Sequence, residues 1–210
     1  LLGEVNLFFR SSVELTDEVR DLLEAMTRHL ASAMEGLRAN ALEREAAVSE
    51  ERSLLARELA PRHRVINASV SGETSAGGLT RLPAALQQHK PDVLILALGG
   101  NDGLRGLPPA ELRDNLDRMV ELARARRTRV LLVGIELPPN YGPRYTREFA
   151  AVYDEVARNR KLPLVPSLIA GFGADRSMFQ PDAIHPVAAA QPRMLSVVKP
   201  ALQPLLKDAR

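Results

Sequence analysis

The stretch from Asp92 to Asp102 reads DVLILALGGND, a continuous apolar run that ends in two glycines and two polar residues. Such a run, bounded by turn-forming residues, is typical of a strand that is buried on both faces of a parallel sheet. Further strand patterns occur at residues 64–68, 129–135 and 163–166, and helical patterns at residues 79–89, 109–126, 145–160 and 191–206. This alternation predicts an α/β fold in which helices cover both faces of a parallel sheet.

The composition is ordinary for a globular protein and narrows the classes of function. The 210 residues are 45% hydrophobic and carry a formal net charge of +2, which does not indicate a nucleic-acid partner. The chain has no cysteine, so disulfides and thiolate chemistry are excluded. No apolar run approaches the roughly 18 residues that a membrane-spanning helix needs. Residues 1–10 lack the basic start and apolar core of a signal peptide, and we therefore expect a cytoplasmic protein.

The first 60 residues differ in composition from the rest. All 15 prolines lie at Pro61 or later, and residues 13–60 contain the single glycine Gly36. Apolar residues recur there at steps of three and four, which predicts one long helix of about 65–70 Å at 1.5 Å per residue. Such a helix needs a partner for its apolar stripe, so we expect a coiled coil and a homo-oligomer; a solvated charged helix is the alternative. The chain therefore divides into residues 1–60, a short strand and an oligomerisation helix, and residues 61–210, an α/β domain.

The run from Asp182 to Pro186 reads DAIHP and carries an acid and a base. The spacing of Asp182 and His185 suits a short turn in which the carboxylate accepts a hydrogen bond from one imidazole nitrogen. The other nitrogen is then available as a general base for a hydroxyl group. A plain surface turn is the alternative for this motif taken alone.

Two loops could supply hydrogen bonds to a developing oxyanion. Asn101 follows the apolar run of the opening stretch, and its side-chain amide is a suitable donor. Gly72 lies in the loop that follows residues 64–68, and its backbone N–H is a second donor. Either loop alone could be an ordinary turn. Because all three motifs follow predicted strands or precede the last helix, we expect them to form one active site.

Residues 64–206 resemble the SGNH (GDSL-type) hydrolase superfamily, in particular its bacterial thioesterase I, lysophospholipase and arylesterase group. The similar runs are Asn67–Ser75, Arg81–Pro83, Leu98–Gly106, Leu137–Gly142 and Asp182–Pro186. The resemblance implies a flavodoxin-like three-layer sandwich that hydrolyses esters and thioesters without a metal or an organic cofactor. It also implies that Asp182 and His185 are triad members and that Gly72 and Asn101 are oxyanion donors.

The Gly-Asp-Ser-Leu segment that carries the family's nucleophile is missing. The family's first strand is central, and the best substitute here is Glu4–Phe9, which is short, apolar and β-prone. If Glu4–Phe9 takes the place of that central strand, Ser12 falls at the nucleophile position. Two alternatives remain: Ser11 and Ser12 belong to a helix cap, or the site is inactive. The other nearby serines, Ser69, Ser71 and Ser75, match non-catalytic positions of the family.

The N-terminal segment resembles the signalling helix of nitrate/nitrite-type sensor histidine kinases, through residues 3–9 and 50–59. Ala60 and Pro61 stand where that family has its phospho-accepting histidine, so the resemblance implies dimerising helices without kinase activity. A helix this long extends far beyond the start of the next strand. We therefore expect either a hairpin near Gly36–Asn40 or, preferably, exchange of residues 1–12 between subunits.

The leading interpretation is a carboxylic-ester hydrolase acting on short to medium acyl esters. The alternatives are an impaired hydrolase scaffold in a helix-mediated assembly and a fusion of two unrelated genes.

Overall fold

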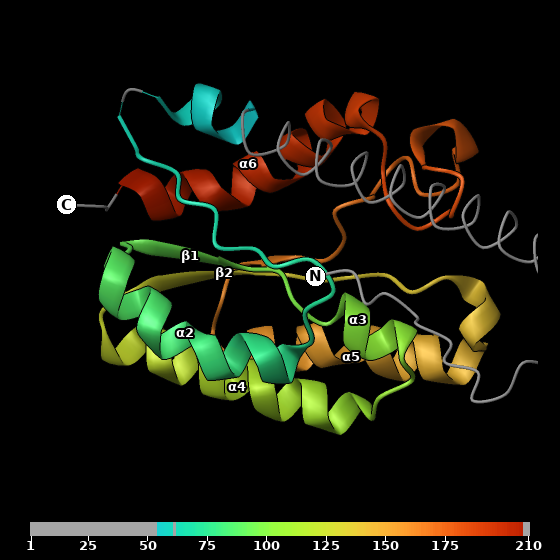
Figure 1. The fold of residues 1–210 in the computed structure, drawn as a ribbon, viewed down its shortest axis with the longest axis horizontal. Helices are drawn as coiled ribbons and strands as arrows, with labels where there is room; N and C mark the ends of the chain where they lie inside the picture. Colours follow the sequence, from blue (N-terminus) through green and yellow to red (C-terminus); the bar gives the residue numbers. More distant parts are fainter. Residues whose placement is uncertain (1–53, 61, 208–210) are drawn as a thin grey trace, which may run out of the picture. The chain divides into compact units, whose positions relative to one another are not determined.

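The computed structural model describes residues 54–60 and 62–207, and these contain a parallel sheet of three strands (Figure 1). The strands are β1 (Val93–Leu96), β2 (Arg129–Val133) and β3 (Leu164–Val165), in the order β1-β2-β3. Val93 pairs with Arg129, and Leu132 pairs with Leu164. The predicted strands at 92–98, 129–135 and 163–166 are confirmed, although each is shorter than its apolar run.

The helices lie close to the predicted positions. They are α2 (Ser75–His89), α3 (Gly100–Leu104), α4 (Pro109–Ala125), α5 (Pro143–Arg160) and α6 (Gln191–Lys207), with single 3-10 turns at Pro139–Tyr141, Arg176–Met178 and Ala188–Ala190. Residues 54–59 are also helical. Helix α2 starts earlier than predicted because the Thr74 side chain accepts a hydrogen bond from the Gly77 N–H, at 3.3 Å, and so caps the helix.

Alternate strand residues face two separate cores, which gives three layers. Leu94, Leu96, Val130 and Leu132 pack with α2, α4 and α5, whereas Val93, Ile95, Leu131 and Val133 pack with α6 and with Leu55 and Leu59. This is the period of two expected of a sheet covered on both faces. Figure 1 shows α6 on one side of the sheet and α2, α4 and α5 on the other. The predicted α/β sandwich is thus confirmed.

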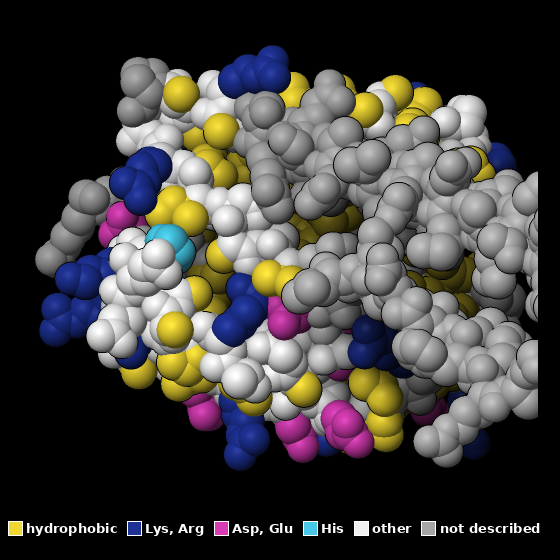
Figure 2. All heavy atoms as spheres, viewed as in Figure 1, with side chains coloured by type: hydrophobic (Ala, Val, Ile, Leu, Met, Phe, Trp, Pro, Cys, Tyr) yellow, Lys and Arg dark blue, Asp and Glu magenta, His cyan; other side chains and the backbone are white. Residues whose placement is uncertain are grey.

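The surface over α2 and α4 carries charges of both signs. Figure 2 shows Lys and Arg side chains interspersed with Asp and Glu along this edge of the molecule. No helix within residues 54–60 and 62–207 is both long and apolar enough to cross a membrane.

The prediction of a strand over residues 64–68 is wrong. Residues 63–70 have no regular structure, and Ile66 and Val70 are exposed. Side chains bind the backbone of this segment instead of a neighbouring strand: Asn67 Oδ1 accepts from the Ser69 N–H at 2.6 Å, and Arg81 Nη1 donates to the Ala68 carbonyl at 2.6 Å. Such local bonds compete with a sheet ladder for the same backbone groups.

Strand β1 is less buried than its apolar sequence predicts. Among its four residues only Leu96 is buried, whereas four of the five residues of β2 are buried. Within the part of the chain that is described, β1 pairs with β2 alone. The predicted strand Glu4–Phe9, Ser12 and most of the predicted long helix lie outside the described residues.

Candidate active site

The acid and the base predicted from the DAIHP motif are in contact. Asp182 Oδ2 lies 2.8 Å from His185 Nδ1, and Asp182 Oδ1 accepts from the backbone N–H groups of Ile184 and His185 at 3.0 and 3.1 Å. The carboxylate therefore fixes both the backbone of the turn and the plane of the imidazole ring. The His185 side chain is 45% exposed, and Nε2 makes no hydrogen bond to another described residue.

Backbone bonds close the turn that carries this pair. The Gln180 N–H donates to the His185 carbonyl at 2.7 Å, and the Ala183 N–H donates to the Gln180 carbonyl at 2.9 Å. Phe179 and Pro186 form an antiparallel bridge on either side. Ala183 adopts the left-handed φ of 63° that such a tight turn requires. The loop geometry thus explains how the two side chains meet over a spacing of three residues.

The opening stretch ends in a short helix rather than the predicted polar turn, and Asn101 lies in its first turn. Gly99 allows the change of direction, because it has a φ of 121° and a Cβ there would lie 2.3 Å from the Tyr153 hydroxyl oxygen. Gly100 has no such restriction: a Cβ on it would make only ordinary contacts, the nearest at 3.6 Å. The first glycine of the pair is therefore the one that the structure requires.

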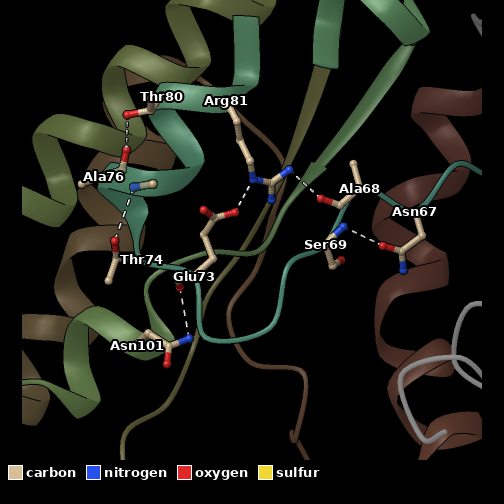
Figure 3. A network of polar contacts seen from close by, with 10 residues as sticks. Asn67, Ala68, Ser69, Glu73, Thr74, Ala76, Thr80, Arg81 and Asn101 are labelled. Atoms are coloured by element: carbon tan, nitrogen blue, oxygen red, sulfur yellow. Dashed lines mark hydrogen bonds and ion pairs between the residues drawn. The ribbon is translucent and has the colours of Figure 1, made fainter. Parts of the chain in front are cut away.

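The Gly72 loop is tied to α3 by two hydrogen bonds. Asn101 Nδ2 donates to the Glu73 carbonyl at 3.1 Å, and Arg105 Nη2 donates to the Gly72 carbonyl at 3.1 Å. Figure 3 shows the Asn101 side chain pointing at this loop, with Arg81 held between the Glu73 carboxylate and the Ala68 carbonyl. An amide nitrogen carries two hydrogens, so the bond to Glu73 orients Asn101 and leaves its second N–H for a ligand.

Three tyrosine hydroxyls hold the backbone around α3. Tyr141 donates to the Leu104 carbonyl at 3.0 Å, Tyr145 to Leu107 at 2.8 Å, and Tyr153 to Leu98 at 2.9 Å. Burial, and then the negative charge of Asp102, raises the pKa values of Tyr145 and Tyr153. Both groups therefore remain protonated donors at neutral pH.

Sequence reasoning missed a buried polar cluster beneath the site. Ser75 is fully buried, and its N–H and hydroxyl both donate to the carboxylate of Asp102, which is 2% exposed. Asn115 Nδ2 in turn donates to Ser75 Oγ at 2.9 Å. This burial agrees with the prediction that Ser75 is not the nucleophile. The only sequence signal was the acidic residue after Asn101, which is equally common in a turn.

The predicted residues form two groups. One is Asp182 with His185, and the other is Asn101 with the Gly72 loop. Figure 1 shows α3 and the loop before α6 toward the same end of the sheet, where β1 finishes. No serine among residues 54–60 and 62–207 makes a hydrogen bond to His185. Ser12 lies outside the described residues.

Comparisons with known proteins identify the family of the chain. Residues 31–191, more than half of the chain, match the GDSL-like Lipase/Acylhydrolase family, and this match starts upstream of residue 64, where the resemblance begins. Esterase TesA of Pseudomonas aeruginosa is 56% identical over 144 residues, 69% of this chain and 72% of that protein. The Escherichia coli protein named thioesterase 1/protease 1/lysophospholipase L1 is 42% identical over 142 residues, 68% of each chain.

The fold comparison gives the same result. A crystal structure of TesA superimposes with a TM-score of 0.70 at 54% identity, covering 73% of this chain and 87% of that one. The chain belongs to the GDSL-like lipase/acylhydrolase family.

Proposed function

We propose that this protein is a carboxylic-ester hydrolase that forms an acyl-enzyme on short to medium acyl esters, thioesters included. The observation that carries the proposal is the 2.8 Å contact between Asp182 and His185, which fixes one imidazole nitrogen of a side chain that is 45% exposed. The names of the similar proteins, an esterase and a thioesterase, support the same class of reaction.

In the first step, His185 Nε2 accepts the proton of the nucleophilic hydroxyl as that oxygen attacks the ester carbonyl carbon. Asp182 holds the ring through Nδ1 and stabilises the imidazolium that forms. The free N–H of Asn101 and the backbone N–H of Gly72 stabilise the oxyanion. The imidazolium then gives its proton to the departing alcohol or thiol, and the acyl group remains on the enzyme.

In the second step, water attacks the acyl-enzyme with His185 as the base. The tetrahedral intermediate collapses to a carboxylic acid, and the proton returns to the nucleophile. Exposed apolar side chains next to the proposed machinery support an acyl substrate: Ile184 precedes His185 and is 39% exposed, and Val70 precedes the Gly72 loop and is 54% exposed.

Ser12 is the proposed nucleophile. The test is reaction with a fluorophosphonate followed by mass spectrometry of the adduct, with Ser12→Ala and Ser71→Ala as a matched pair. We expect the label on Ser12 and its loss in Ser12→Ala alone. A label on another serine would move the nucleophile, and a protein that neither labels nor hydrolyses p-nitrophenyl butyrate would refute the hydrolase function.

We propose further that the N-terminal helix drives oligomerisation and that residues 1–12 are exchanged between subunits. The half-buried β1, which pairs only with β2 among the described strands, supports a further strand at its other edge. Mixing inactive Ser12→Ala and His185→Ala proteins tests the exchange, because only a heterodimer restores one complete site. Recovery of about one quarter of wild-type activity is the statistical expectation for a swapped dimer. No recovery, with a fully active wild-type monomer at nanomolar concentration, would refute it.

A further inference from the structure

A buried carboxylate joins three helices directly behind Asn101. Asp102 Oδ2 accepts from the Ser75 N–H at 2.8 Å and Oδ1 accepts from the Ser75 hydroxyl at 2.5 Å. Ser75 is the first residue of α2, Asp102 lies in α3, and Asn115, which donates to Ser75 Oγ, lies in α4. The Ser75 hydroxyl and both carboxylate oxygens of Asp102 thus each have a hydrogen-bond partner.

The cluster requires a carboxylate at this position. Both oxygens of Asp102 act as acceptors, and they face the N-terminus of α2, where the helix dipole favours a negative charge. An amide would turn its NH₂ group toward one of the two Ser75 donors, so one buried donor would lose its acceptor. The two acceptor oxygens of Asp102 therefore join α3 to the start of α2.

This contact fixes the relative position of the two oxyanion donors. Asn101 precedes Asp102 in α3, while Gly72 lies three residues before Ser75 in the loop that enters α2. Asp102 and Asn101 therefore bond the same segment, Asp102 through Ser75 and Asn101 through the Glu73 carbonyl. Among the described residues, the other side-chain hydrogen bonds that hold this loop against α3 are those of Asn101, which is part-buried, and Arg105, which is exposed.

We propose that Asp102 is a positioning residue for the oxyanion site: through Ser75 it holds the Asn101 amide and the Gly72 N–H in a common geometry. This inference rests on the proposed ester hydrolysis. Asp102 touches no reacting atom and acts through Asn101 and the Gly72 loop. Its removal should therefore lower kcat while KM changes little, because the oxyanion forms only after substrate has bound.

The kinetic test is a double-mutant cycle between Asp102→Asn and Asn101→Ala. Loss of one oxyanion donor costs roughly 100- to 1,000-fold in kcat, and we expect Asp102→Asn to lower kcat by about 10- to 100-fold in the wild-type background. In the Asn101→Ala background the same change should cost at least about threefold less than in the wild type, since one of the two donors that Asp102 positions is gone. Asp114→Asn, on an exposed residue of α4, is the matched control and should leave kcat unchanged. Equal losses in both backgrounds would overturn the proposal.

A second measurement does not depend on hydrolysis. The Asn101 side-chain amide, assigned by its loss in Asn101→Ala, should have an order parameter near the rigid value of about 0.85 in the wild type and below about 0.6 in Asp102→Asn. Ser75→Ala, which keeps the backbone donor to Asp102, should give an intermediate value. An amide that stays rigid in Asp102→Asn would refute the positioning role. A mobile amide in a protein without esterase activity would instead refute the proposed function and leave the positioning contact supported.

Discussion

Replacing Gly99 with alanine should destabilise the protein more than the same change at any exposed glycine. The new Cβ would lie 2.3 Å from the Tyr153 hydroxyl oxygen and 3.0 and 3.1 Å from the two methyl carbons of Leu112. Leu112 and Tyr153 are 1% and 2% exposed, so neither side chain can move into solvent. Forcing a residue into a filled core costs about 1–3 kcal/mol, and a strained backbone angle adds about 1–3 kcal/mol. We expect a loss of about 2–6 kcal/mol in the free energy of unfolding.

Two other glycines separate these contributions. Gly106 has a φ of 68° but nothing within 4 Å of a Cβ, so Gly106→Ala should show the backbone strain alone. Gly100→Ala meets neither restriction and should be close to neutral, within about 0.5 kcal/mol. The three variants are compared by urea unfolding, followed by circular dichroism, at one pH and temperature.

A second substitution tests the clash itself. Tyr153→Phe removes the hydroxyl that the new Cβ would strike, together with its 2.9 Å bond to the Leu98 carbonyl. If the steric reasoning is right, Tyr153→Phe should cost about 1 kcal/mol alone but less, or nothing, in the Gly99→Ala background. A Gly99→Ala variant that loses no more stability than Gly106→Ala would refute it.

Three further predictions concern the proposed triad, a surface carboxylate and the core. His185→Ala should lower kcat for p-nitrophenyl butyrate by about 10²- to 10⁴-fold; a variant with full activity would reject the mechanism. Bonds from the Ser177 hydroxyl and N–H lower the pKa of Asp175, so any stability it contributes is present above its unfolded pKa and lost as pH falls through the lower folded value. Ser177→Ala should raise that pKa toward the ordinary value of 3.8, as measured by carboxyl ¹³C NMR titration, and an unchanged pKa would assign the shift to another cause. Leu116→Ala, at a site with no exposed surface, should cost about 2–5 kcal/mol in urea unfolding, and a loss below about 1 kcal/mol would show that the core collapses around the gap.

The sequence predicted the elements that carry a regular local pattern of apolar residues. Helices α4, α5 and α6 and strand β2 carry patterns that specify both type and buried face, and the structure places them within a few residues of expectation. The DAIHP turn was predictable for the same reason, since Asp182 and His185 are close in the chain and bond each other.

The remaining features depend on contacts between distant residues. Residues 64–68 have a strand-like composition, but Arg81 bonds the Ala68 carbonyl and the Asn67 side chain bonds the Ser69 N–H. No local pattern reveals the contact with Arg81. The polar residues after Gly99 have the composition of a turn. They form a helix instead, in which Asp102 bonds Ser75, 27 positions away in the chain. Only the three-dimensional structure shows that these two residues meet.

The tyrosine bonds around α3 have a consequence for the order in which the site acquires structure. An isolated helix of five residues does not form in water, since nucleating its first turn is unfavourable by a factor of about 10³. α3 therefore depends on contacts with longer helices: Asp102 bonds Ser75 of α2, and Tyr145 and Tyr153 of α5, a helix of 18 residues, bond the backbone on either side of α3. The Gly103 amide, bonded to the Gly99 carbonyl at 2.9 Å, should exchange with solvent when the contacts of α3 with α2 and α5 open. The proposed oxyanion site would then form after α2 and α5 have docked, so changes deep in those helices would reach the site without touching it.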